Sequence, residues 1–177
     1  GLMMSAILSD TLCFRSPTCT PDDIQAGNAL AAICGEDPEQ YSDAMFDAGA
    51  SLEGRTADEV FNSDFKIFSR GDASFGVGQG SFMTKKSRRA AEKLIEPYFE
   101  AAAKAKDLPD LFYMFTDIRS QTTEMLYYGP HAEKLLMRAF DVAPRKGRVV
   151  LPGVVSRKKQ VIPALMSTIQ TYQEEQD

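Results

Sequence analysis

The chain has 177 residues, of which 44% are apolar and 25% charged, as expected for one globular domain or one domain with part of another. Its net charge of −5 argues against a nucleic-acid partner, because proteins that bind nucleic acid carry a basic patch. No apolar run approaches the ~20 residues that a membrane-spanning helix needs, so we expect no membrane partner. The three cysteines lack CxxC spacing, which argues against disulfides or zinc and favours a cytoplasmic location.

The N-terminal part of the chain predicts three helices. Apolar residues within 2–12 recur at helical spacing, which predicts the first helix. Thr20 is typical of an N-cap, Pro21 of the first helical position and Gly35 of a helix end, so a second helix is predicted between them. A third helix is predicted to begin at Asp37.

Residues 51–57 have the composition of a linker between domains. Thr56, with Glu59 three positions later, forms a capping-box pattern that predicts a short helix after the linker. The stretch that follows alternates apolar and polar residues on either side of Gly71 and Asp72. This pattern predicts two strands joined by a tight turn.

The rest of the chain alternates between helices and strands. Residues 85–106 predict a long amphipathic helix that is interrupted near Pro97. A further helix is predicted with Pro130 at its first position, and a last one after residue 160. Apolar runs predict strands at 110–118, 123–129 and 147–155. The order favours the α/β class, with a mixed β-sheet flanked by helices.

Three stretches that resemble functional motifs have simpler explanations. GVGQGS, residues 76–81, lacks the third glycine of a dinucleotide loop and the GK[ST] of a P-loop, which favours glycines in a strand edge or bulge. KKSRR, residues 85–89, is typical of a solvated helix face. The only histidine, His131, stands at a predicted helix start, where a surface or capping role is favoured over catalysis.

The stretch GVVSRKKQVIP places Arg157, Lys158 and Lys159 directly before the last predicted helix. A cation beside a helix N-terminus is unfavourable by about 0.3–1 kcal/mol, whereas anions bind there to free N–H groups. The stretch also follows an apolar strand, and ligands of α/β sheets bind beyond the carboxyl ends of strands. It therefore indicates either an anion-binding turn, with Arg157 as a fork for phosphate oxygens, or a solvated polar loop.

One carboxylate, Asp10, lies in an apolar helical stretch, SAILSDTL. Burying an ionised carboxylate is costly unless it is paired or binds a metal. The residues alone leave two interpretations open, a buried carboxylate with a partner or an Asp at the end of a helix that faces solvent.

These motifs together resemble the family II inorganic pyrophosphatases, the manganese-dependent type within the DHH phosphoesterase superfamily. GVVSRKKQVIPAL is similar to the C-terminal motif of that family, and SAILSDTLCFRSPTCT is similar to its SAIISDTL…KSPTCT segment. DFKIF, FTDI and the order of elements between them are similar as well. The resemblance covers nearly the whole chain, and its two end motifs are the specific ones.

The resemblance implies roles for four residues. Asp10 is implied as a metal ligand, Arg157 and Lys158 as residues that bind substrate phosphates, and Lys66 of the D-x-K-x-F strand as a further substrate contact. It also implies Mn²⁺ or Co²⁺, with Mg²⁺, as cofactors and pyrophosphate as the substrate. The implied reaction converts pyrophosphate and water to two phosphates by attack of a metal-activated hydroxide.

The other metal ligands of that family, including its Asp-His-His triplet, have no counterpart in a chain with a single histidine. We therefore interpret residues 1–50 as the C-terminal helical part of a DHH domain, 51–57 as a linker and 58–177 as a DHHA2 substrate-binding domain. On this interpretation the chain is an inactive portion of a parent enzyme with no complete catalytic set. Its partners would be pyrophosphate, the N-terminal DHH domain of the same parent and, for the full-length parent, a second copy in a homodimer.

Two alternatives remain open from the sequence. One is another DHH phosphoesterase, such as a short-chain exopolyphosphatase. The other is a non-catalytic module that binds anions or mediates interactions, against which the context of Asp10 argues.

Overall fold

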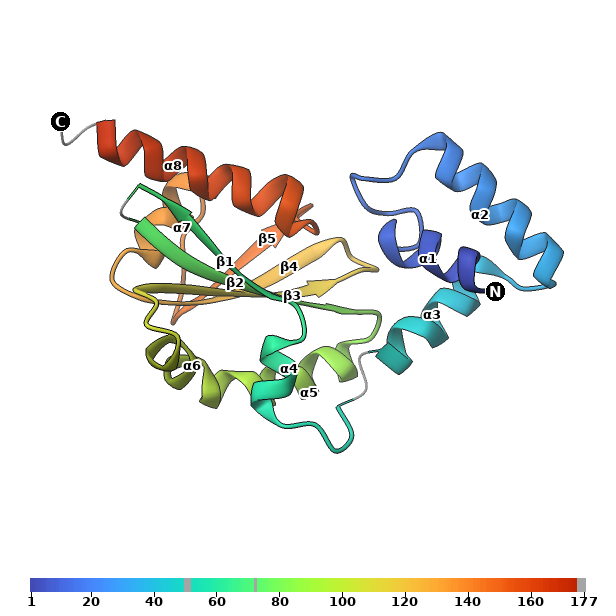
Figure 1. Ribbon diagram of the computed structural model, residues 1–177, viewed down its shortest axis with the longest axis horizontal. Coiled ribbons are helices and arrows are strands. Elements are labelled where there is room, and N and C mark those ends of the chain that lie inside the picture. The colour runs from blue at the N-terminus through green and yellow to red at the C-terminus, as the bar shows by residue number, and fades with distance from the viewer. Residues whose placement is uncertain (50–51, 72, 175–177) are drawn as a thin grey trace.

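The computed structural model describes residues 1–49, 52–71 and 73–174. Three helices come first and form a helical unit beside a five-stranded sheet (Figure 1). They are α1 (Leu2–Asp10), α2 (Pro21–Cys34) and α3 (Pro38–Gly49). The unit has a small core of its own, which includes Met4, Leu8, Cys13 and Ala31.

The predicted helix signals in this unit are confirmed. The Thr20 side chain accepts a hydrogen bond from the backbone of Asp23 in a capping box, and Gly35 ends α2 with a left-handed φ of 71°. The first helix is shorter than predicted, because the chain turns after Asp10 and Leu12 adopts a φ of 50°.

The remaining elements build the sheet and its helical cover. The strands are β1 (Phe65–Arg70), β2 (Ala73–Phe82), β3 (Asp110–Asp117), β4 (Thr122–Tyr128) and β5 (Arg148–Pro152). The helices are α4 (Ala57–Asn62), α5 (Lys85–Ile95), α6 (Phe99–Ala105), α7 (Ala132–Phe140) and α8 (Ile162–Glu174). The strands lie in sequence order, and only β2 and β3 are parallel. The predicted mixed sheet flanked by helices is confirmed.

Both faces of the sheet are covered by helices (Figure 1). In β3, Tyr113 faces a core that it shares with Phe61 of α4 and Ile95 of α5. The adjacent Phe112 faces a second core with Leu165 of α8. Because both sides of β3 are buried, its sequence is a continuous apolar run, as predicted for a buried strand.

The predicted interruption of the long helix near Pro97 is confirmed, since a 3₁₀ turn at Glu96–Tyr98 separates α5 from α6. The predicted hairpin is confirmed as β1 and β2, although Asp72 of its turn lies outside the described residues. The placement of Pro130 at the first helical position is wrong. Helix α7 begins at Ala132, because the N–H of the preceding residue, His131, donates to Asp110 instead of opening the helix.

The glycines of GVGQGS lie in β2, the second strand of the sheet, and not in a phosphate-binding loop. A Cβ atom on Gly76 would come within 2.5 Å of the Phe65 ring, and one on Gly78 within 2.5 Å of the Tyr113 ring. These glycines make room for aromatic rings on one face of the sheet. Their expected place in a strand is confirmed, but the expected strand edge or bulge is wrong, because β2 is paired without interruption to β1 and β3.

Polar contacts join the helical unit to the part of the chain that carries the sheet. The Gln121 side chain donates to the carbonyl of Arg15 at 3.0 Å, and Arg119 pairs with Asp43. The Lys159 ammonium lies 3.4 Å from the carbonyl oxygen of Pro17. Within the described residues, the helices are too short or too polar to cross a membrane.

Candidate functional site

The basic turn, residues 156–161, opens the last helix. It begins one turn earlier than α8 itself, because Arg157–Val161 form a π-helical turn that continues into Ile162. Arg157 and Lys158 therefore lie within the first turn of this helix. The sequence predicted them directly before the helix, which is wrong. The Ser156 hydroxyl accepts a hydrogen bond from the backbone of Lys159 at 3.2 Å and caps the turn.

A glutamine side chain fixes the loop that leads into this turn. Gln160 Oε1 accepts hydrogen bonds from the backbone N–H groups of Val155 and Ser156, both at 2.9 Å. Its Nε2 donates to the carbonyl oxygen of Gly153 at 2.7 Å. The turn is thus held in one conformation at the carboxyl side of β5.

Arg157 is the buried member of the basic turn, with 8% of its surface exposed. Its Nη1 donates to the carbonyl oxygens of Asp64 at 2.7 Å and Val77 at 3.1 Å. Its Nη2 donates to Asp64 Oδ1 at 2.5 Å. These bonds use three of the five N–H donors of a guanidinium and leave two for a ligand.

Lys66 lies on β1 beside the same part of the sheet. It pairs with Val77 across the two antiparallel strands, and opposed residues of such a pair face the same side. Val77 belongs to the core under α8, and its carbonyl is the one that Arg157 contacts. The structure therefore brings together the segments of Lys66 and Arg157, which are far apart in the sequence.

Lys158 and Lys159 are both exposed. Lys159 reaches the loop between α1 and α2 through its contact with Pro17. The two most distinctive stretches of the sequence, SRKK and SPTCT, are thus neighbours in space.

Asp10 is exposed at the end of α1, which favours the second of its two interpretations in this structure. Its neighbour Ser9 lines a cavity of about 280 Å³ between the helical unit and the sheet. Asp64, Gln79 and Arg55 line the same cavity. The cavity lining does not include residues 156–161. It is linked to the basic turn through Asp64, which pairs with Arg157, and through Gln79, whose Nε2 donates to the carbonyl oxygen of Val155.

The sequence did not single out Asp64, Gln79 or Arg55. Asp64 had one signal, its place two residues before Lys66 in the D-x-K pattern. Gln79 and Arg55 had none, because their place beside Asp64 in the cavity lining depends on how β2 and the linker pack together.

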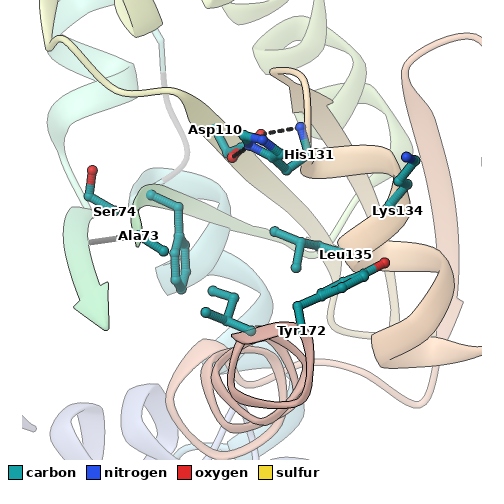
Figure 2. A pocket seen from close by; sticks show the side chains of 9 residues that line it. Ala73, Ser74, Asp110, His131, Lys134, Leu135 and Tyr172 are labelled. Carbon is teal, nitrogen blue, oxygen red and sulfur yellow. Dashed lines mark hydrogen bonds and ion pairs between the residues drawn. The ribbon is translucent and has the colours of Figure 1, made fainter. Parts of the chain in front are cut away.

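His131 lies at a different place, near the amino-terminal ends of β2 and β3. Figure 2 shows it against Asp110, with Nδ1 3.0 Å from Oδ2 and the backbone N–H donating to Oδ1 at 2.9 Å. Asp110 is buried, whereas the His131 side chain is 69% exposed. The pair borders a mostly apolar cavity of about 290 Å³ between α7 and α8. The His131–Asp110 pair holds the start of α7, as the capping interpretation of His131 expected.

The interpretation of KKSRR as a solvated face holds for Lys86, which is exposed, but is wrong for Arg88. The Arg88 guanidinium lies 2.7 Å from Glu124 on the sheet and 2.8 Å from Glu92. Burial raises the pKa of Glu124, but hydrogen bonds from Arg88 and Arg148 outweigh it and hold that pKa below its ordinary value. The sequence could not reveal this pairing, because β4 lies far along the chain.

Comparison with known families identifies the family of the chain. The family model described as the DHHA2 domain matches residues 43–168. The chain belongs to the DHHA2 domain family. The matched part of this DHHA2 protein contains Lys66, Arg157 and Lys158 and does not extend to Asp10.

Curated relatives of this DHHA2 protein include two clostridial pyrophosphatases. A probable manganese-dependent inorganic pyrophosphatase of Clostridium acetobutylicum is 41% identical over 170 residues, which are 96% of this chain and 54% of that protein. A cobalt-dependent inorganic pyrophosphatase of Clostridium perfringens is 39% identical over 97% of this chain and 31% of its own length. The DHHA2 chain thus spans about half the length of the first relative and about a third of the second.

A solved structure confirms the fold. The crystal structure of a candidate family II inorganic pyrophosphatase from Methanococcus jannaschii superposes with a TM-score of 0.81 at 32% identity. The match covers 96% of this chain and 55% of that one. The similarity includes the helical unit as well as the DHHA2 sheet, since almost the whole chain is covered.

Proposed function

We propose that this chain is the substrate-binding portion of a manganese-dependent inorganic pyrophosphatase, an enzyme that converts pyrophosphate and water to two phosphates. Arg157, Lys158 and Lys66 bind the phosphate oxygens and offset their negative charge. The observation that carries the proposal is that the buried Arg157 donates to the carbonyl oxygen of Val77, the residue that pairs with Lys66 across β1 and β2.

The chemistry of a small, highly charged anion fits these residues. Pyrophosphate hydrolysis needs cations that stabilise charge as it develops on the phosphoryl and leaving groups. Arg157 supplies a planar fork that matches phosphate oxygens, while the lysines act as flexible point charges. The start of the helix that the basic turn opens adds the positive end of a helix dipole.

The described residues do not fit a metal centre by themselves. They contain no group of three or more His, Cys, Asp or Glu side chains that could hold a metal ion. Asp10 alone cannot hold a two-metal site, so in this proposal the manganese or cobalt is bound mainly by residues outside this chain. In this proposal Asp10, which follows Ser9 of the cavity lining, contributes one ligand.

The helical unit has a surface suited to those missing residues. Leu2, Met3 and Ile33 are 90%, 70% and 81% exposed. Large apolar side chains gathered on two adjacent helices favour a protein partner. We infer that the N-terminal DHH domain of the parent enzyme packs on α1 and α2 and completes the active site with the DHHA2 part.

Titration of the ¹⁵N-labelled chain with pyrophosphate tests this proposal. The amide resonances of residues 156–160 and those near Lys66 should shift together. The dissociation constant should be on the order of millimolar, because a wet site without metal gains ~0–1 kcal/mol per exposed ion pair. Added salt should weaken binding, since exposed charges are screened over ~8–10 Å.

Two variants sharpen the titration. Lys158→Ala should weaken pyrophosphate binding, whereas Lys86→Ala, on the exposed face of α5, should leave it unchanged. Shifts confined to residues 85–89, or no shifts at all, would show that the basic turn is a solvated loop.

A further inference from the structure

The guanidinium of Arg157 has two kinds of partner. Nη1 donates to the backbone carbonyl oxygens of Asp64 and Val77, at 2.7 and 3.1 Å. The Asp64 carbonyl also accepts the N–H of Gln79 at 3.0 Å, so it is fixed by the sheet. Nη2 donates instead to the Asp64 carboxylate at 2.5 Å, and that group can rotate on its side chain.

The two carbonyl contacts hold Arg157 in place without help from the carboxylate. They use both N–H groups of Nη1 and leave the three N–H groups of Nη2 and Nε for other partners. The Asp64 carboxylate occupies one of these three. The carboxylate therefore occupies a donor of the guanidinium that a ligand anion would use.

The Asp64 carboxylate is also the accessible member of the pair. Its side chain is 49% exposed, against 9% for Arg157. It lines the cavity of about 280 Å³ between the helical unit and the sheet, so it is open to solvent. Carboxylate and phosphate oxygens bind a guanidinium in the same bidentate geometry, so they compete for the same donors.

We propose that the Asp64 carboxylate is an internal competitor for Arg157, which an incoming phosphate group displaces from Nη2, so that Asp64 sets the affinity of the site for phosphate anions. This inference rests on the proposed function, because it takes Arg157 as a phosphate-binding residue. Because the Asp64 side chain is half exposed, water can hydrate its carboxylate when it leaves the guanidinium. A phosphate that binds two donors at once can therefore replace it, while a singly bound anion gains less.

Inorganic phosphate titrations of the chain, followed by amide resonances of residues 156–160, test the inference. Asp64→Asn keeps the shape of the side chain and removes its charge, so phosphate should bind about fivefold more tightly, as expected for loss of a unit charge at about 6 Å in a wet site. Asp64→Glu retains a carboxylate and should stay within about twofold of the unsubstituted chain. Asp107→Asn makes the same chemical change in an exposed loop before β3 and should have no effect.

The outcomes separate this inference from the proposed function. If the unsubstituted chain responds at residues 156–160 but Asp64→Asn binds phosphate equally or more weakly, Asp64 does not compete for Arg157 and this inference alone fails. If Asp64→Glu binds as tightly as Asp64→Asn, charge is not the cause and the inference also fails. If residues 156–160 respond in none of the variants, both the inference and the proposed anion site are overturned.

Discussion

Replacing Arg157 with alanine should destabilise the fold as well as weaken phosphate binding. The side chain is buried and makes three hydrogen bonds, to Asp64 Oδ1 and to the carbonyls of Asp64 and Val77. Hydrogen bonds to a charged group contribute about 1.5–3 kcal/mol each, and a buried acceptor left without a donor costs about 1–3 kcal/mol. Water from the adjacent cavity can satisfy part of this loss. We therefore expect a decrease in the free energy of unfolding of about 2–4 kcal/mol.

The matched control is Lys158→Ala in the same turn. Because Lys158 is exposed, its loss should change the free energy of unfolding by less than about 0.5 kcal/mol while still weakening pyrophosphate binding. Urea unfolding followed by circular dichroism and tyrosine fluorescence measures both variants, since the chain has no tryptophan. An Arg157→Ala protein within about 0.5 kcal/mol of the unsubstituted chain would refute the argument that the sheet carbonyls anchor this side chain.

Three further results are expected. Gly78→Ala should lower the free energy of unfolding by about 1–3 kcal/mol, because the new Cβ would lie 2.5 Å from the Tyr113 ring. Phosphate affinity should not change. A melting temperature equal to that of the unsubstituted chain would contradict the packing argument. The Glu124 pKa is lowered on balance, since the hydrogen bonds from Arg88 and Arg148 outweigh the opposing effect of burial, so its contribution to stability is present above the ordinary pKa of 4.5 and is lost as pH falls below it. Thermal melts should therefore show Glu124→Gln less stable than the unsubstituted chain at pH 7, with a smaller difference at pH 3. A difference that does not shrink as pH falls would contradict this. The chain alone should not hydrolyse pyrophosphate with Mn²⁺, so phosphate release at about 1 per second or faster would contradict the assignment of the metal ligands to another part of the enzyme.

Local signals predicted most of the fold. The N-cap signal at Thr20 and the capping-box pattern at Thr56 predicted two helix starts, and Pro97 marked the break between α5 and α6. The error at Pro130 has a tertiary cause, since the buried Asp110 carboxylate draws the N–H of His131 away from the helix. Contacts of this kind join residues about twenty positions apart and leave no local pattern.

The site was predictable in part. The basic turn had a signal of its own, because three cations at a helix start are unfavourable without an anion. The role of Lys66 came only from resemblance, and its placement beside Arg157 depends on the pairing of β1 with β2. The Asp64 contact was not predictable, since it joins residues 93 positions apart and depends on the burial of the Arg157 side chain.

A crystal structure of the chain grown with imidodiphosphate, a non-hydrolysable pyrophosphate analogue, tests the central claim most directly. The account predicts analogue oxygens within about 2.7–3.2 Å of the nitrogens of Arg157, Lys158 and Lys66, at the exposed end of the basic turn. Analogue bound elsewhere, or an Arg157 side chain that contacts only Asp64 and Val77 at saturating analogue, would contradict it.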